Sequence, residues 1–393
     1  MPTLRAAKEK LTRLTKGKPD VATRIEVDIL PAVARRLMKA QQKKTKLASE
    51  DEINKLIEDA AHATGTDVDP EFLKDEWRLI VDAWNVQDGD QYREIPRLGR
   101  KVRMVASRRD EVWQVFENVR EQLSKGSLNT DASLMHEMAD TLQRAPYTHV
   151  VIDEAQDISA PELRFVAAIA ADKSNGLFFA GDIGQRIFRS PFPWKSTGVD
   201  IQGRSRSLKV NYRTSHQIRT MSDQLLPQRL IEADGGEEKR TGVTSVFHGP
   251  KPELHQFDTA DNEAEALGLW IANLVSKELD PKMLAVLVRS ENEIERATLA
   301  IDKSGVAGLR PILMHDAKGQ EFRAVAVMAC DAEILPLEAR ILNATDETEL
   351  KEIYDTERHL LYVAATRARD FLWVSGCRPT SEFLEDIADQ FMS

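Results

Sequence analysis

Short apolar runs alternate with longer amphipathic stretches from Tyr147 onward, and glycine, aspartate or asparagine residues bound many of these runs. Apolar runs of this length are typical of strands that are buried on both faces. Strands that alternate with helical stretches are typical of parallel sheets covered by helices. The pattern therefore predicts an α/β protein. The predicted strands are 149–152, 177–180, 207–210, 284–288, 312–314, 324–328 and 371–374, and the predicted helices include 161–171, 260–277 and 292–303.

The N-terminal part of the chain lacks this alternation. Roughly the first 145 residues have the apolar spacing of helices. Between Asp110 and Leu123, for example, apolar residues recur every three or four positions. Farther along, Gly235 and Gly236 stand among charged residues and mark a loop, which is a plausible seam between two α/β units.

Composition narrows the class of protein. The 393 residues contain no apolar run as long as a membrane span, and the two cysteines show no metal-binding spacing. The eight histidines are scattered, so no zinc site is expected. With so few cysteines we expect a reduced, cytoplasmic compartment. Without a membrane-length apolar run we expect no membrane partner. The net charge is −10, yet Met1–Glu50 holds 13 Lys and Arg against 5 Asp and Glu. This basic arm is either a solvated helical face or a contact for nucleic-acid phosphates.

The strongest local signal is Val-Val-Ile-Asp-Glu-Ala-Gln-Asp at residues 150–157. An apolar strand ends there in two adjacent carboxylates, and ligands of open parallel sheets bind beyond the carboxyl ends of strands. Asp153 can hold Mg²⁺, which prefers a carboxylate together with phosphate oxygens. Glu154 can polarise an attacking water. The alternative is an ordinary charged turn between a strand and a helix.

Four further segments follow in order, and each also has an ordinary structural interpretation. In the first, Gln185 follows a strand and a Gly-Asp turn, where it could reach a γ-phosphate or the attacking water. In the second, Arg213 offers a planar cation for phosphate, and Tyr212 offers a face for a base. The third joins two apolar strands, and the fourth is an apolar-faced helix that ends in arginine. These segments are residues 177–185, 208–214, 315–322 and 357–369.

Taken together and in this order, the five segments resemble motifs II to VI of superfamily-one helicases of the UvrD/Rep/PcrA type. The resemblance covers roughly residues 148–376 and extends more weakly upstream. It implies two RecA-like lobes with parallel sheets, the first incomplete at its N-terminus and carrying a helical insert. The implied parts are a remnant of the first lobe at 1–45, the insert at 46–130, the first lobe at 131–230 and the second lobe at 231–393.

The resemblance also implies roles for individual residues. Asp153 would coordinate Mg²⁺, Glu154 would act as general base, and Gln185 would sense the γ-phosphate. Arg213 and Arg367 would act as arginine fingers from facing domains. The remaining implied contacts are Tyr212 stacking on adenine, Lys318, Gly319 and Glu321 beside the nucleotide, and Phe188 and Trp194 stacking on DNA bases.

The implied function is ATP hydrolysis coupled to 3′→5′ movement along single-stranded DNA, with ATP and Mg²⁺ as cofactors. One part of the family's pattern is missing, because no Gly-x-x-x-x-Gly-Lys-Ser/Thr loop occurs in the sequence. We expect a truncated, fragmentary or degenerate chain whose ATPase activity is impaired. Two rivals stay open: a non-catalytic DNA-binding or interaction remnant of a helicase, and a half-motor completed by a second polypeptide that supplies the loop. The biological pathway is also left open.

Overall fold

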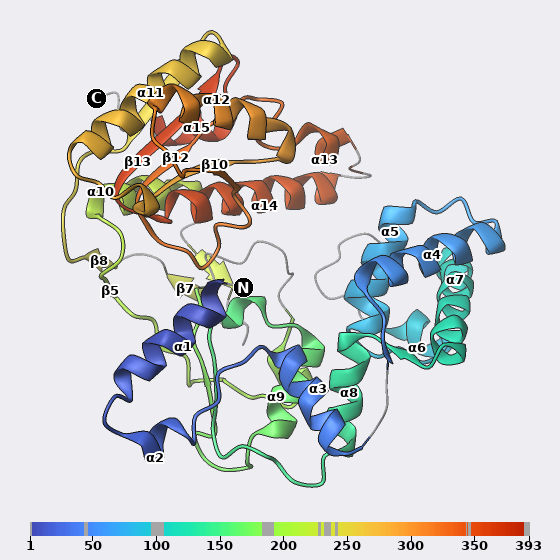
Figure 1. Ribbon diagram of the computed structural model, residues 1–393. Coiled ribbons are helices and arrows are strands. Elements are labelled where there is room, and N and C mark those ends of the chain that lie inside the picture. The colour runs from blue at the N-terminus through green and yellow to red at the C-terminus, as the bar shows by residue number, and fades with distance from the viewer. Residues whose placement is uncertain are drawn as a thin grey trace. The chain divides into compact units, whose positions relative to one another are not determined.

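The computed structural model describes residues 2–42, 46–95, 106–182, 192–226, 229–231, 237–239, 243–342, 344 and 347–388. These residues form two compact units, which are described separately (Figure 1). Unit 1 takes in the described residues up to Gly181 together with residues 192–204. Unit 2 takes in Asp182, residues 205–226 and the described residues from Arg229 onward. None of the helices in these ranges is long and apolar enough to cross a membrane.

Unit 2 is built on a five-stranded sheet whose strands are all parallel, which confirms the predicted α/β fold with parallel sheets. The strand order is β11-β10-β12-β13-β9. The neighbours that are consecutive in the chain, β10 with β11 and β12 with β13, are parallel and are therefore joined by crossover connections. Strand β10 is buried at every position, as its unbroken apolar sequence predicts. The bounds are β9 Glu253–Phe257, β10 Leu284–Val288, β11 Pro311–Leu313, β12 Phe322–Val327 and β13 Ala368–Cys377.

Helices cover both faces of this sheet (Figure 1). On one face Val286 of β10 packs with α11 and α12, and on the other Leu287 packs with α10, α14 and α15. Side chains therefore alternate between two cores, as strand geometry requires. The helices of unit 2 are α10 His216–Ser222, α11 Ala260–Ser276, α12 Ile294–Ser304, α13 Glu338–Leu342, α14 Glu347–Ala365 and α15 Glu382–Ala388, with short 3₁₀ turns at Asp223–Leu225, Pro281–Met283 and Glu291–Glu293.

The boundary between the units lies earlier than the predicted lobe boundary at residue 230. Residues 205–226 belong to unit 2 because α10 contributes Ile218 and Met221 to the core under the sheet. The backbone N–H of Ser215 also donates to the carbonyl of Arg369 at the start of β13. Two small pairs complete the unit: β5 Val210–Asn211 with β8 Thr244–Ser245, and β6 Arg229–Ile231 with β7 Glu237–Lys239.

The lobe of unit 1 contains a parallel pair of strands, β3 Val150–Ile152 and β4 Leu177–Phe179. One face of this pair packs on α9, where Leu163 and Val166 are fully buried. The other face carries Val151 and Phe178, whose exposed fractions are 68% and 62%. The other lobe elements are α1 Pro2–Leu14, α2 Pro19–Ala22, α3 Leu30–Ala40, α8 Asp131–Thr141, α9 Ala160–Ile169, the 3₁₀ turns Ala155–Asp157 and Trp194–Thr197, and the strand pair β1 Lys46–Leu47 and β2 Leu128–Asn129.

The described residues 50–95 and 106–125 form a helical insert with a core of its own. Helix α4 begins at a capping box, in which Ser49 and Glu52 bond to each other's backbone N–H groups. The stripe predicted between Asp110 and Leu123 is confirmed, because its apolar side chains are buried in this core. The insert contains α4 Glu50–Thr64, α5 Pro70–Glu76, the π-helix η1 Trp77–Asp82, α6 Gly89–Glu94 and α7 Ala106–Lys125.

Candidate functional site

The carboxylate pair lies at the end of β3, where parallel sheets bind ligands. Asp153 is exposed and Glu154 is half-buried. The backbone turns sharply here, because Glu154 has φ 53° and ψ 40°, in the left-handed region. A non-glycine residue in this region costs of order 1–2 kcal/mol, and such residues cluster at functional sites. The Glu154 N–H donates to Asp153 Oδ1 at 3.0 Å, and Gln156 Nε2 donates to Glu154 Oε2, which fixes both carboxylates.

Gly181 holds this turn against the end of β4. The Ala155 N–H donates to the carbonyl of Ala180 at 2.8 Å, so the chain after β4 runs against the turn. A Cβ on Gly181 would lie 2.4 Å from Gln156 Oε1 and 3.0 Å from its backbone nitrogen. Only glycine therefore fits at this position without a shift.

Asp153 and Glu154 form a donor set that suits Mg²⁺. This ion is usually held by one or two carboxylates plus substrate phosphates and water, rather than by a full protein cage. Within the described ranges, no group of three or more His, Cys, Asp or Glu side chains is placed to hold a metal. Any Mg²⁺ at this turn would therefore depend on phosphate oxygens for part of its coordination.

The residues after β4 are placed only in part. Gln185 and Phe188 lie outside the described residues, so their predicted roles stay predictions. Trp194 is 7% exposed, and its ring lies edge-on to Phe179 with 4.7 Å between centroids. A ring packed in this way has little face left for a base. The aromatic side chain that reaches out from this segment is Phe192, which is half-buried and lies edge-on to Trp84 at 5.8 Å.

In unit 2, Arg213 is placed by the turn after β5. The Asn211 side chain accepts from the backbone N–H groups of Arg213 at 2.8 Å and Thr214 at 3.1 Å. Arg213 Nη2 donates to the carbonyl of Gln320, and Nε lies 3.2 Å from Glu321 Oε2. That Nε is nevertheless buried without a hydrogen-bond partner. Its neighbour is the Glu321 carboxylate, so Arg213 is held by one carboxylate and one backbone carbonyl of the same loop.

Arg367 reaches the same backbone group from another direction. It follows the end of α14 and is fully buried. Its Nε donates to the carbonyl of Val363 at 3.0 Å, and Nη1 donates to that of Gln320 at 3.3 Å. The expectation that Arg213 and Arg367 come from facing domains is wrong, because both lie in unit 2 and converge on one carbonyl oxygen. The sequence could not show this, since the two arginines are brought together only by the packing of α10 and β13.

The loop between β11 and β12 carries the other predicted nucleotide contacts. Gly319 has φ 75°, a conformation that glycine adopts freely. Gln320 Nε2 donates to the carbonyl of Asp316 at 2.7 Å and closes the loop on itself. Glu321 is exposed and faces Arg213, while Lys318 is half-buried. The loop therefore brings Glu321 to Arg213 and the carbonyl of Gln320 to both arginines.

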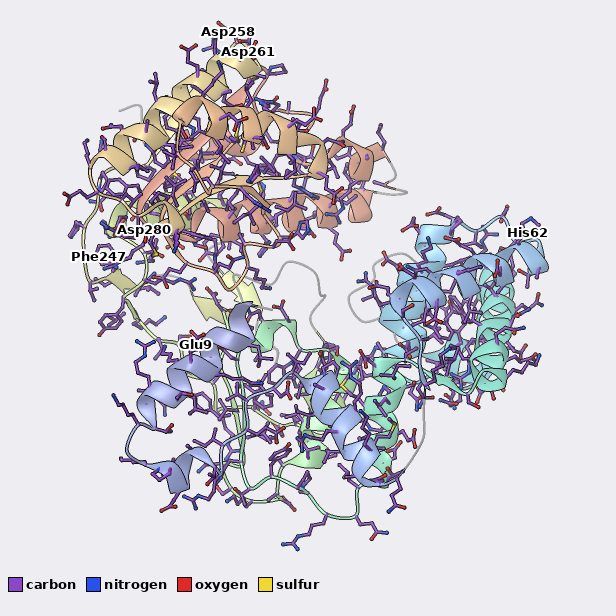
Figure 2. The ribbon with its side chains drawn as sticks, in the orientation of Figure 1. Glu9, His62, Phe247, Asp258, Asp261 and Asp280 are labelled. Atoms are coloured by element: carbon purple, nitrogen blue, oxygen red, sulfur yellow. The ribbon has the colours of Figure 1, made fainter. Side chains whose placement is uncertain are left out.

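Two aromatic side chains of unit 2 lie near arginine residues. Tyr212 precedes Arg213 in the chain and is 74% exposed, which leaves a face for a base. Phe247, labelled in Figure 2, follows β8. The guanidinium carbon of Arg369 lies 5.6 Å from the centroid of the Phe247 ring. Arginine is always charged and matches phosphate geometry. This part of unit 2 can thus bind an anionic group beside an aromatic one, as a nucleotide requires.

Comparisons with known proteins match an N-terminal and a C-terminal part of the chain to domains of UvrD-like helicases. The model of the UvrD/REP helicase N-terminal domain matches residues 3–192. The model of the UvrD-like helicase C-terminal domain matches residues 311–379. Together the two matches cover more than half of the chain.

Individual relatives are distant and longer. DNA helicase IV of Escherichia coli K12 is 24% identical over 304 residues, which cover 70% of this chain and 42% of that protein. ATP-dependent DNA helicase UvrD2 of Mycobacterium tuberculosis H37Rv is 23% identical over 186 residues, 46% of this chain and 25% of that protein. The chain thus spans less than half the length of these relatives. A solved C-terminal domain of a possible DNA helicase from Lactobacillus plantarum WCFS1 is 19% identical with a TM-score of 0.32, covering 46% of this chain and 96% of that domain.

Proposed function

The chain belongs to the UvrD/Rep-like helicases of superfamily one, and from this premise we propose that it carries most of an ATP-driven motor that moves along single-stranded DNA. One observation supports the proposal most directly. Arg213 and Arg367, far apart in the sequence, donate to the same carbonyl beside Glu321. This arrangement can present two cations to one phosphoryl group.

The proposed reaction is hydrolysis of the terminal phosphoanhydride bond of ATP. Mg²⁺, when bound, would neutralise the phosphate oxygens, with Asp153 as its protein ligand. Glu154 would accept a proton from the attacking water, and its fixed position after β3 would orient that water. Arg213 and Arg367 would stabilise charge that develops on the transferred group, a role worth about 10³- to 10⁵-fold in rate. Tyr212 would stack on the base, with Lys318, Gly319 and Glu321 beside the nucleotide. Gln185 would sense the γ-phosphate.

Phosphate binding needs a further part. Backbone N–H groups and a lysine of a glycine-rich loop cradle the phosphates in such motors, and no segment of this sequence has that pattern. We infer that a second polypeptide supplies these donors. The bare face of β3 and β4 at Val151 and Phe178 supports this inference, because parallel sheets are normally covered on both faces.

The movement would run 3′→5′ on single-stranded DNA in the cytoplasm. A second candidate is a non-catalytic DNA-binding or interaction protein, and the absence of the phosphate loop favours it for the isolated chain. The two candidates differ in a measurable way. A motor hydrolyses ATP once the phosphate donors are supplied, whereas a binding protein does not.

DNA binding can be tested on the chain as it stands. Fluorescence anisotropy with a labelled oligonucleotide should show weak binding that falls steeply with salt, because phosphate contacts release counterions. Phe188→Ala should weaken binding by about 1–3 kcal/mol if this ring stacks on a base. Trp194→Ala should instead lower thermal stability and leave the affinity of the folded fraction unchanged, since Trp194 packs on Phe179. Two results would contradict this account: an affinity for DNA that does not depend on salt concentration, and loss of that affinity in folded Trp194→Ala but not in Phe188→Ala.

A further inference from the structure

Three consecutive residues at the end of the π-helix η1 link the helical insert to the lobe of unit 1. Trp77, Ile80 and Val81 of η1 are buried in the core of the insert. Asp82 is the last residue of the π-helix, Ala83 and Trp84 follow it, and each of the three contacts the lobe. π-helical turns are rare and occur often at functional sites.

The first contact ties Asp82 to the start of α8. Thr130, the N-cap of α8, is 3% exposed and donates its hydroxyl to Asp82 Oδ1 at 2.6 Å. The same hydroxyl oxygen accepts the backbone N–H of Ser133 at 2.9 Å. One side chain therefore both caps the lobe helix and bonds to the insert.

The second contact ties the backbone of Ala83 to α8 and, through it, to α9. His136 is 4% exposed, and its Nε2 lies 3.1 Å from the carbonyl of Ala83. Its Nδ1 lies 3.1 Å from Nη1 of Arg164, which is a donor. Only the neutral ring with its proton on Nε2 satisfies both neighbours, and burial lowers the pKa of His136, which favours that neutral form. Helix α9, which carries Arg164, begins three residues after Asp157.

The third contact ties Trp84 to the segment that follows β4. The Trp84 and Phe192 rings meet edge to face, at 5.8 Å and 87°. Phe192 also packs on the cluster that contains Trp194 and Val166. The three contacts thus reach α9, which follows the turn that carries Asp153 and Glu154, and Phe192, which lies after β4.

We propose that residues 82–84 form a joint that couples the helical insert to the segments following β3 and β4, so that a change in one is felt by the other. Coupling needs contiguous contacts between two parts that can each rearrange, and it must act equally in both directions. In a motor, the joint would carry a change at the γ-phosphate to the insert. That consequence rests on the proposed function, whereas the coupling can be measured without nucleotide or DNA.

Hydrogen exchange on the full chain tests the joint. Trp84→Ala should speed exchange about 2- to 10-fold at the bonded amides of 196–199 in the lobe, the range expected for loss of one aromatic pair. Phe192→Ala should speed exchange by a similar factor at the bonded amides of 84–86 in the insert. The double variant should show no more than the larger single effect, because both substitutions break the same contact. Trp84→Leu, which keeps most of the volume on the insert side, serves if the alanine variant does not fold.

Leu56→Ala is the matched control, because Leu56 is a half-buried side chain of α4 packed on the same insert core. It should speed exchange within α4 and α7 and affect amides 196–199 far less than Trp84→Ala does, because it leaves the contact between Trp84 and Phe192 in place. Two results would overturn the proposal. One is that Trp84 and Phe192 variants affect only their own side of the contact, and the other is that the double variant shows the product of the two single effects. Neither result would bear on the proposed ATPase, which this experiment does not measure.

Discussion

At the scale of single residues, the turn after β3 depends on a glycine that belongs to the neighbouring strand's end. Gly181 lies against Gln156, and Gln156 bonds to Glu154. A side chain at Gly181 would therefore act on the proposed general base without touching it.

We predict that Gly181→Ala lowers the free energy of unfolding by about 1–3 kcal/mol, the usual cost of overpacking a tight site. The Cβ would meet backbone as well as side chain, so rotation of Gln156 alone cannot relieve the contact. Urea unfolding followed by circular dichroism measures the loss. Gly126→Ala is the control, because its nearest atoms are the movable end of the Leu128 side chain. Equal effects for both variants would show that Gly181 has no special role.

Asp82 should make the stability of unit 1 depend on pH. Burial raises its pKa from 3.8 to about 6, opposed by the Thr130 hydrogen bond and by Arg120, and reinforced by Asp131. Because the folded state holds the proton more tightly than the unfolded state, stability falls as pH rises from about 4 to about 6 and is level above that. The fall should be at most about 3 kcal/mol.

Asp82→Asn tests this dependence, because asparagine still accepts from Thr130 but does not titrate. The difference in unfolding free energy between wild type and variant should change between pH 4 and pH 6 and stay constant from pH 7 to pH 8. A difference that is the same at every pH would mean that Asp82 is not the titrating group.

At the scale of elements, the strand pair β3 and β4 has one packed face and one bare face. Phe178 on the bare face is 62% exposed, whereas Phe179 on the other face packs on Trp194. Exposed apolar strands with free edges are prone to self-association.

We predict that Phe178→Ser raises the temperature at which the chain begins to aggregate and changes its unfolding free energy by less than about 0.5 kcal/mol, as for other surface substitutions. Light scattering during heating and urea unfolding measure the two effects. Phe179→Ser is the matched control and should destabilise the lobe by several-fold more. If Phe178→Ser destabilises the lobe as much as Phe179→Ser does, the face with Phe178 is already covered. Its exposure would then no longer support a second polypeptide that packs there.

Some helices and strands could be predicted from the sequence and others could not. Strands β10 to β13 of unit 2 and the buried stripe of α7 follow from periodicity, because burial on one or both faces leaves a local pattern. Strand β9 was missed, because it is a partly exposed edge strand with polar residues in its sequence. The expected strand at 207–210 is observed only as Val210–Asn211. Leu208 is 88% exposed, so its apolar character did not reflect burial. The contacts of Asp82, Ala83 and Trp84 with the lobe were not predicted, because a local pattern shows which side is buried and not what it is buried against.

The same limit applies to the site. The roles of Asp153, Glu154 and the arginines were predicted from the order of their segments along the chain, but the placement of Arg213 and Arg367 in one unit could not be. Trp194 was expected to stack on DNA, and its sequence context gives no sign that it packs on Phe179. Phe192 and Trp84 were missed because no single segment contains both.

At the scale of the whole molecule, the proposed motor lacks the loop whose N–H groups and lysine would bind the phosphates of ATP. The chain alone should hydrolyse ATP at or near background, even with single-stranded DNA. Fusing a relative's strand, phosphate loop and following helix ahead of Met1 should supply the donors and cover the bare face at Val151 and Phe178.

The most direct test is the steady-state ATPase rate of this fusion with saturating single-stranded DNA. We predict that DNA stimulates turnover and that Glu154→Gln abolishes it. Arg213→Ala and Arg367→Ala should each slow turnover by about 10³-fold or more, because these groups act on transition-state charge. Both arginine substitutions should weaken ATP binding far less than they slow turnover. A change at Leu56, which lies in the helical insert, should leave the rate within a few-fold. A fusion that folds and binds ATP but whose turnover is untouched by either arginine substitution would contradict the proposed motor.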